Sequence, residues 1–112
     1  MMPELPEVET TRRGLEPHLR GKQIEAVDVY RRDLRWPIPD EFEEILTGQQ
    51  FRAFRRVGKY LVIDIANGMS ILAHLGMSGT FRIEPTMPAE LRKHDHVTIQ
   101  FEDDTVLIFR DP

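Results

Sequence analysis

The sequence predicts a mainly β domain of the α+β class, namely an antiparallel β-sandwich flanked by an N-terminal helix and one further short helix. Three observations lead to this prediction. Apolar residues near the start of the chain recur at helical spacing. After Gly48, short runs rich in β-branched and aromatic residues alternate with turns that contain Gly, Asn or Pro. The 112 residues, 40% of them hydrophobic, suffice for one domain that buries its own core.

The N-terminal helix is expected over residues 3–19. Leu5, Val8, Leu15 and Leu19 recur near helical spacing, with charged side chains between them. A proline suits the first turn of a helix because its missing N–H would have no partner there, and the glutamates of that turn complement the positive end of the helix dipole. A later proline and glycine mark the end of the helix.

A strand over residues 22–30 and a short helix over residues 37–48 are expected next. The strand has apolar residues at alternating positions, which is typical of an element with one buried face. The helix would place Phe42 and Ile45 on one face, and Asp40 is expected to cap its N-terminus.

Six strands are expected after Gly48, and short turn signals such as Asn67-Gly68 separate them. The last two strands, on either side of Asp103-Asp104, form the clearest hairpin in the sequence. The regular spacing favours an antiparallel sandwich. The six segments are residues 51–56, 59–66, 70–75, 80–83, 97–101 and 106–109.

Charge and cysteine content narrow the function classes. The chain has 15 Lys+Arg against 19 Asp+Glu, a formal charge of −4, so any nucleic-acid binding must come from a local cationic patch. The absence of cysteine excludes disulfides and thiolate zinc sites and favours a reducing compartment. The acidic first ten residues and the lack of a long apolar run predict a cytoplasmic protein with no membrane partner.

Pro3 is chemically the most unusual residue because it lies close enough to the start to become a free N-terminus. A free N-terminal proline is a secondary amine, which can attack an aldehyde-like carbon and form a cationic iminium that serves as an electron sink. The alternative is that Pro3 and Pro6 only shape the start of a helix. Methionine removal needs a small second residue, so Pro3 is free only if translation starts at Met2 and not at Met1.

The His94-Asp95-His96 run invites a metal-site interpretation. Side chains alternate along a strand, so both imidazoles would lie on one face and the carboxylate on the other. No third ligand follows at a suitable spacing, whereas a zinc site needs three or four ligands. We therefore predict no metal site in this chain.

Six motifs follow one another along the whole chain. They are MPELPEVET at 2–10, LRWP at 34–37, RRVGKYL at 55–61, HLGMSG at 74–79, KHDHV at 93–97 and RDP at 110–112. In this order they resemble the N-terminal region of the formamidopyrimidine-DNA glycosylase family of base-excision repair enzymes. Several unrelated motifs would have to coincide, so the resemblance is specific, and it favours the chemical interpretation of Pro3 over the helix-start alternative.

The resemblance implies a bifunctional enzyme that acts on damaged double-stranded DNA. Such an enzyme removes oxidised purines, namely 8-oxoguanine and ring-opened formamidopyrimidine, from a flipped-out nucleotide and then cuts the strand at the abasic sugar. Pro3 would attack C1′ and form a Schiff base, and Glu4 would protonate the sugar ring oxygen. Lys59 would be the general acid/base of β-elimination or hold the neighbouring phosphate. Glu7 would support the site, with a solvated carboxylate that only complements the helix dipole as the alternative.

The same resemblance implies three DNA contacts. Met77 lies in a glycine-rich turn and would enter the helix as an apolar wedge that fills the gap left by the extruded nucleotide. His74 and His94 would contact phosphates, with a satisfied core histidine as the alternative for His74. His96 is expected to be structural.

The whole chain, residues 1–112, resembles the N-terminal catalytic domain of this family. The family's helix-two-turns-helix module and four-cysteine zinc finger are missing, so zinc is expected only in that missing part and no cofactor is expected here. Those modules carry most phosphate contacts, and we expect a monomer with little or no activity on its own. Two alternatives are a non-catalytic sandwich that binds DNA or protein and, with less support, an isomerase that uses an N-terminal proline.

Overall fold

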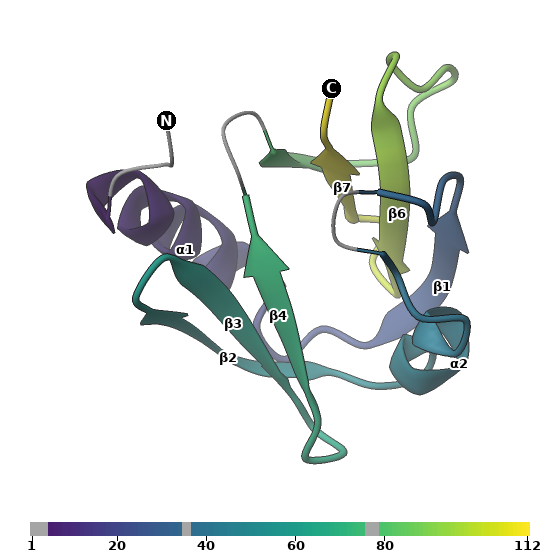
Figure 1. Ribbon diagram of the computed structural model, residues 1–112. Helices are drawn as coiled ribbons and strands as arrows, with labels where there is room; N and C mark the ends of the chain where they lie inside the picture. Colours follow the sequence, from purple (N-terminus) through teal and green to yellow (C-terminus); the bar gives the residue numbers. More distant parts are fainter. Residues whose placement is uncertain (1–4, 35–36, 76–78) are drawn as a thin grey trace.

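The computed structural model describes residues 5–34, 37–75 and 79–112, in which two antiparallel sheets face each other (Figure 1). One sheet has the strand order β1-β6-β7-β5 and the other the order β2-β3-β4. The predicted antiparallel sandwich is therefore confirmed. The strands of the first sheet are β1 (Ile24–Val29), β5 (Thr80–Glu84), β6 (Asp95–Phe101) and β7 (Val106–Arg110). The strands of the second are β2 (Phe51–Val57), β3 (Tyr60–Ile65) and β4 (Ser70–His74).

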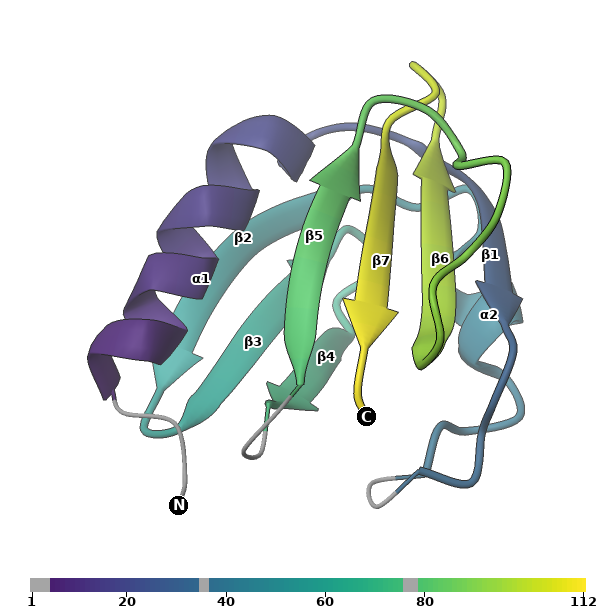
Figure 2. The same cartoon turned by 90° about the horizontal axis from the view of Figure 1, so that it is seen from above.

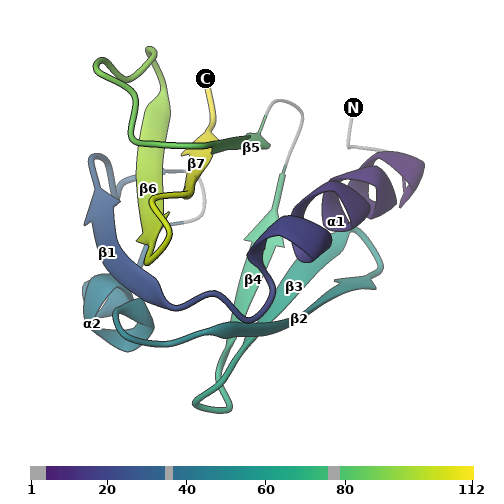
Figure 3. The same cartoon turned by 180° about the vertical axis from the view of Figure 1, so that it is seen from behind.

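A helix lies at each side of the sandwich. Figure 2 shows α1 (Leu5–Leu19) alongside β2, between the β2 and β5 edges of the two sheets. Figure 3 shows α2 (Phe42–Leu46) on the opposite side, where it packs against β1. The apolar stripe of α1 is buried, with Val8, Leu15 and Leu19 at most 4% exposed. Within the described ranges, no helix is long and apolar enough to span a membrane.

Three phenylalanine rings join the two sheets at the centre of the core. Phe51 packs edge to face against Phe54, also on β2, and against Phe101 on β6, with ring centroids 5.7 Å and 5.8 Å apart. Burial of one such ring stabilises the fold by about 1.5–3 kcal/mol relative to leaving it exposed. This packing fixes one sheet against the other and so fixes the strand ends that carry the site.

The turn between β2 and β3 lies one residue later than predicted. Val57 pairs directly with Tyr60, so Gly58 and Lys59 form a two-residue turn, and Lys59 lies at its tip instead of beginning the strand. Gly58 has a φ of +60°, which residues with side chains adopt at a cost. A positive φ at this place matches the twist of a two-residue hairpin, which explains the glycine before the lysine.

The second helix is shorter than predicted, and the expected capping role of Asp40 is wrong. The helix α2 has 5 residues, and its N-cap is Glu41, whose side chain makes no capping hydrogen bond. Pro39 lies within the predicted helix, and the residue before a proline avoids the helical conformation. The carbonyl of Pro39 accepts a hydrogen bond from the N–H of Phe42 at 3.2 Å, so the helix starts only after this turn.

Candidate functional site

The ends of several elements meet along one side of the sandwich. The first turn of α1, the β2–β3 turn and the C-terminal ends of β4 and β7 all lie on the lower side of the molecule in Figure 2. The strand register agrees, because Tyr60, next to that turn, pairs with His74, while Arg110 pairs with both Thr80 and Asp95. We call this side the site edge, and its described members are Glu7, Lys59, His74 and His94.

Three of the predicted site residues, Pro3, Glu4 and Met77, lie outside the described residues. Their roles stay predictions. Glu7 belongs to the first turn of α1 and is exposed, so its carboxylate complements the positive end of the helix dipole.

Lys59 is exposed at the tip of the β2–β3 hairpin. The turn is braced by Arg56, whose Nη1 donates a hydrogen bond to the carbonyl of Gly58 at 3.3 Å. A long flexible stem can carry the Lys59 ammonium to a phosphate or a sugar next to this tip. The structure thus brings Lys59 to the end of the molecule at which α1 begins (Figures 1 and 3).

His74 and Tyr60 form an aromatic pair beside this turn. They are direct partners across β3 and β4, and their ring centroids lie 5.3 Å apart in an edge-to-face arrangement. Tyr60 is 37% exposed, so its ring limits the positions open to His74 and still presents a surface to solvent. The motifs did not single out Tyr60. The sequence signal that could have identified it is the alternation of side chains along β3. Leu61 and Ile63 face the core, so Tyr60 faces the other side of the sheet.

His94 and His96 have different surroundings although their ring centroids lie 6.1 Å apart. His94 precedes β6 with a φ of +71°, whereas His96 is 5% exposed and its Nε2 lies 2.7 Å from the carbonyl oxygen of Asp111. Partial desolvation, and then the cations Lys93 and Arg110, lower the pKa of His94 below its usual value. His94 is therefore mainly neutral at neutral pH, and the burial of His96 fits the structural role expected of it.

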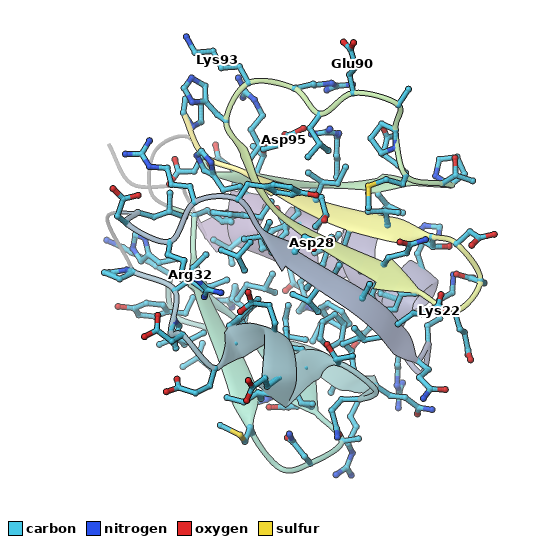
Figure 4. The ribbon with its side chains drawn as sticks, turned by 90° about the vertical axis from the view of Figure 1, so that its right-hand side faces the viewer. Lys22, Asp28, Arg32, Glu90, Lys93 and Asp95 are labelled. Carbon is cyan, nitrogen blue, oxygen red and sulfur yellow. The ribbon has the colours of Figure 1, made fainter. Side chains whose placement is uncertain are left out.

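A buried ion pair holds the first residue of β6 in place. The side chain of Asp95 is 0% exposed and accepts hydrogen bonds from Arg82 at 2.8 Å and 2.7 Å and from the N–H of Arg92 at 2.7 Å. The Arg82 guanidinium is the main cause that lowers the pKa of Asp95. Figure 4 shows Asp95 turned into the molecule, while Lys93 extends away from it. The pair fixes the chain on both sides of Asp95, and hence the position of His94.

These contacts also weigh against a metal site at residues 94–96. The Asp95 carboxylate accepts hydrogen bonds from Arg82, and the imidazole of His96 is hydrogen-bonded to a backbone carbonyl. Among the residues that the structure describes, no group of three or more His, Cys, Asp or Glu side chains is placed to hold a metal ion.

An apolar cavity of about 410 Å³ lies between the two sheets. Aliphatic and aromatic side chains form most of its lining, which includes His74 and Asp111 but not Lys59. Most of this lining also belongs to the hydrophobic core between the two sheets, so the cavity is continuous with the core.

The sequence matches known proteins over its whole length. Residues 2–112 match the family model described as the formamidopyrimidine-DNA glycosylase N-terminal domain. The formamidopyrimidine-DNA glycosylase of Stenotrophomonas maltophilia (strain K279a) is 54% identical over 111 residues, and that of Methylococcus capsulatus is 53% identical over 112 residues. Each alignment covers 99% of this chain but 40% of the relative, so the chain spans about two-fifths of these proteins.

Solved structures show the same fold. The formamidopyrimidine-DNA glycosylase of Lactococcus lactis, non-covalently bound to DNA with an abasic site, matches with a TM-score of 0.89 and 36% identity over 97% of this chain and 41% of that chain. A complex of the L. lactis protein with DNA that contains FAPY-dG matches with a TM-score of 0.87 and 36% identity, over 96% of this chain and 40% of that one. Both matched proteins were crystallised with damaged DNA.

Proposed function

The chain belongs to the formamidopyrimidine-DNA glycosylase family, as its N-terminal domain, and on this premise we propose that it carries the covalent chemistry of a DNA glycosylase and abasic-site lyase. Its substrate is damaged double-stranded DNA with oxidised purines, 8-oxoguanine and formamidopyrimidine. The lack of cysteine fits action in the reducing cytoplasm, and no partner beyond DNA is required of a monomer.

The observation that carries the proposal is the convergence of separate segments at the site edge. The start of α1, the Lys59 turn, His74 on β4 and His94 before β6 lie on one side of the sandwich (Figure 2). An ammonium and two imidazoles on one edge offer the donors that a phosphate backbone needs, although the whole chain carries −4. Chemistry at a sugar needs these groups together with a nucleophile.

The first step is base removal. The Pro3 nitrogen attacks C1′ and the glycosidic C–N bond breaks, so the base departs with the electron pair and takes up the proton that the Pro3 nitrogen gives up. Glu4 then protonates the sugar ring oxygen as the C1′–O bond opens, and the nitrogen lone pair forms the iminium. The product is a Schiff base between Pro3 and an open-chain sugar.

The second step is strand cleavage. The cationic iminium acidifies the hydrogen on C2′, and its removal as a proton gives an enamine. The enamine then re-forms the iminium as a C2′=C3′ double bond forms, the C3′–O bond breaks and the 3′ phosphate leaves with the C–O electron pair. Lys59 is the group that moves the proton or holds that phosphate, and His74 and His94 bind the flanking backbone. This step uses only groups that the site edge and the residues before α1 supply.

Borohydride trapping on duplex DNA with an abasic site tests the proposal. Borohydride reduces an iminium to a stable amine, so a chain started at Met2, in which Pro3 can be freed, should form a covalent DNA adduct. A chain started at Met1 should not, because its Pro3 nitrogen is an amide whose lone pair is delocalised. Mass spectrometry should map the adduct to Pro3. Equal trapping by both chains, or an adduct at Lys59, would contradict the proposed nucleophile.

A further inference from the structure

A polar network joins α1 to the second sheet. Glu9, Arg12 and Glu16 are spaced three and four residues apart and so share one face of the helix. Arg12 donates two hydrogen bonds to the carboxylate of Glu9, each at 2.7 Å, and a third from Nη1 to Glu16 at 3.3 Å. The side chains of all three are between 22% and 28% exposed, so water reaches them only in part.

This face of α1 contacts the backbone of the edge strand β2. The N–H of Phe54 donates to Oε2 of Glu16 at 2.8 Å, and the carbonyl of Phe54 accepts from Nη1 of Arg12 at 3.5 Å. An edge strand has backbone groups that no neighbouring strand satisfies. Glu16 and Arg12 therefore satisfy the backbone groups of Phe54 that a neighbouring strand would otherwise bond. These two hydrogen bonds fix the position of α1 along the length of β2.

Arg56 continues the network from the helix to the Lys59 turn. Its Nε lies 3.9 Å from Oε1 of Glu9, and its Nη1 donates to the carbonyl of Gly58 at 3.3 Å. One side chain thus spans the second turn of α1 and the residue before Lys59. Figures 2 and 3 show the start of α1 and the β2–β3 turn at the same end of the molecule.

We propose that Arg56 is a positioning residue that sets the place of Lys59 relative to the start of α1. The inference rests on the proposed function, because it assigns to Arg56 the alignment of the elimination group with the nucleophile. The Glu9 carboxylate attracts one end of the guanidinium, and the carbonyl of Gly58 accepts a hydrogen bond from the other, so one planar group contacts both elements at once. Small displacements of a catalytic group lower rates steeply, which gives this alignment its effect on chemistry.

The fold itself does not depend on Arg56. The buried residues Val8, Leu15 and Leu19 attach α1 to the core, and Arg56 is an exposed residue. Loss of its side chain should leave the sandwich folded and loosen the turn. This separates a positioning role from a purely structural one.

The test compares Arg56→Met with Arg55→Met in the chain started at Met2, on duplex DNA with an abasic site. Arg55 is the adjacent residue and pairs with Asp64 at 2.7 Å, so its removal changes the net charge equally without touching the network. Arg56→Met should lower the rate of strand cleavage at saturating DNA about tenfold, with the half-saturating DNA concentration equal to that of Arg55→Met. Arg56→Lys, which can keep one of the two contacts, should fall between Arg56→Met and the parent.

A second readout does not depend on activity. The amide order parameters of Gly58 and Lys59 from NMR relaxation should fall in Arg56→Met and stay at the parent value in Arg55→Met. Equal order parameters and equal cleavage rates in the two variants would overturn the role of Arg56 even when the parent traps DNA normally. A parent that forms no adduct would overturn the proposed function, and the order parameters would then still decide whether Arg56 fixes the turn.

Discussion

Two ion-pair networks hold opposite sides of the site edge, and they differ in burial. On the β6 side, the side chains of Asp95 and Arg82 are 0% and 19% exposed. On the α1 side, Glu9 and Arg56 are 28% and 35% exposed. Removing the partner of a buried charge lowers the free energy of unfolding strongly, because the remaining charge is left without solvation. At the surface, water solvates the remaining charge and the loss of stability is small. The contacts on the β6 side therefore stabilise the fold, whereas the contacts on the α1 side mainly set the geometry of the site edge.

Asp95→Asn should have the largest effect on stability. It leaves the Arg82 guanidinium partly buried without its carboxylate, and this should lower the free energy of unfolding by about 3 kcal/mol or more. Urea unfolding followed by circular dichroism measures the change. Asp64→Asn is the matched control, because its partner Arg55 is 53% exposed. Equal losses in the two variants would show that burial does not distinguish these pairs.

Glu16→Ala should have an intermediate effect. The N–H of Phe54 then loses the acceptor at 2.8 Å, which should cost about 1 kcal/mol for one charge-assisted hydrogen bond whose acceptor side chain is 27% exposed. Hydrogen exchange at the Phe54 amide should accelerate, while exchange at amides bonded within the β2–β3 ladder stays slow. Glu16→Gln keeps an acceptor oxygen and should behave more like the parent. Unchanged exchange in Glu16→Ala would contradict the contact between α1 and β2.

Acid titration should reveal a smaller contribution from Glu9. The hydrogen bond from Arg12 is the main cause that lowers the pKa of Glu9 from 4.5 to about 2. A carboxyl whose pKa is lower in the folded state stabilises the fold above its unfolded pKa, and this contribution disappears as the pH falls through the folded value. Between about pH 4.5 and pH 2 the parent should therefore lose more stability than Glu9→Gln. Parallel stability curves for the two proteins would contradict the shift.

DNA binding should change least, because the chain is expected to bind weakly and with strong salt dependence. Lys59→Met removes a cation from the site edge and should reduce the slope of log K against log[salt] by about 0.9, the value for one phosphate. His94→Ala should weaken binding and leave that slope unchanged, since His94 is mainly neutral. Fluorescence anisotropy with a lesion duplex measures both. Nanomolar affinity at physiological salt would show that this edge binds DNA far better than its charges imply.

Alternation and turn chemistry were enough to predict the strands. The segments around Phe51, Leu61 and Val106 have the β-branched and aromatic runs that a sandwich needs, and Asn67-Gly68 marks the turn between two of them. The start of α2 was missed because Asp40 has the chemistry of a cap, whereas the chain makes a turn from Pro39 to Phe42 and the helix begins only after it. Local sequence signals therefore predicted the presence of each helix and strand more accurately than its first residue.

The site was predictable only where a motif carried it. The motifs singled out Lys59 and His94, whose roles stay predictions, but the link from Glu9 through Arg56 to Gly58 joins residues far apart in the sequence. The hydrophobic periodicity of the sequence does not predict contacts that depend on how a helix packs against the edge of a sheet. The pairing of Arg82 with Asp95 was hidden for the same reason, because it follows from the order of strands in the first sheet.

The most direct test of the site edge separates covalent capture from strand cleavage at an abasic site. In the chain started at Met2, Lys59→Ala should keep borohydride trapping at the parent level, because Pro3 supplies the nucleophile. Strand cleavage should slow about hundredfold, which is the contribution expected of one general acid/base. Cleavage as fast as in the parent would contradict the assignment of Lys59 and with it the claim that the α1 start and the β2–β3 turn form one site.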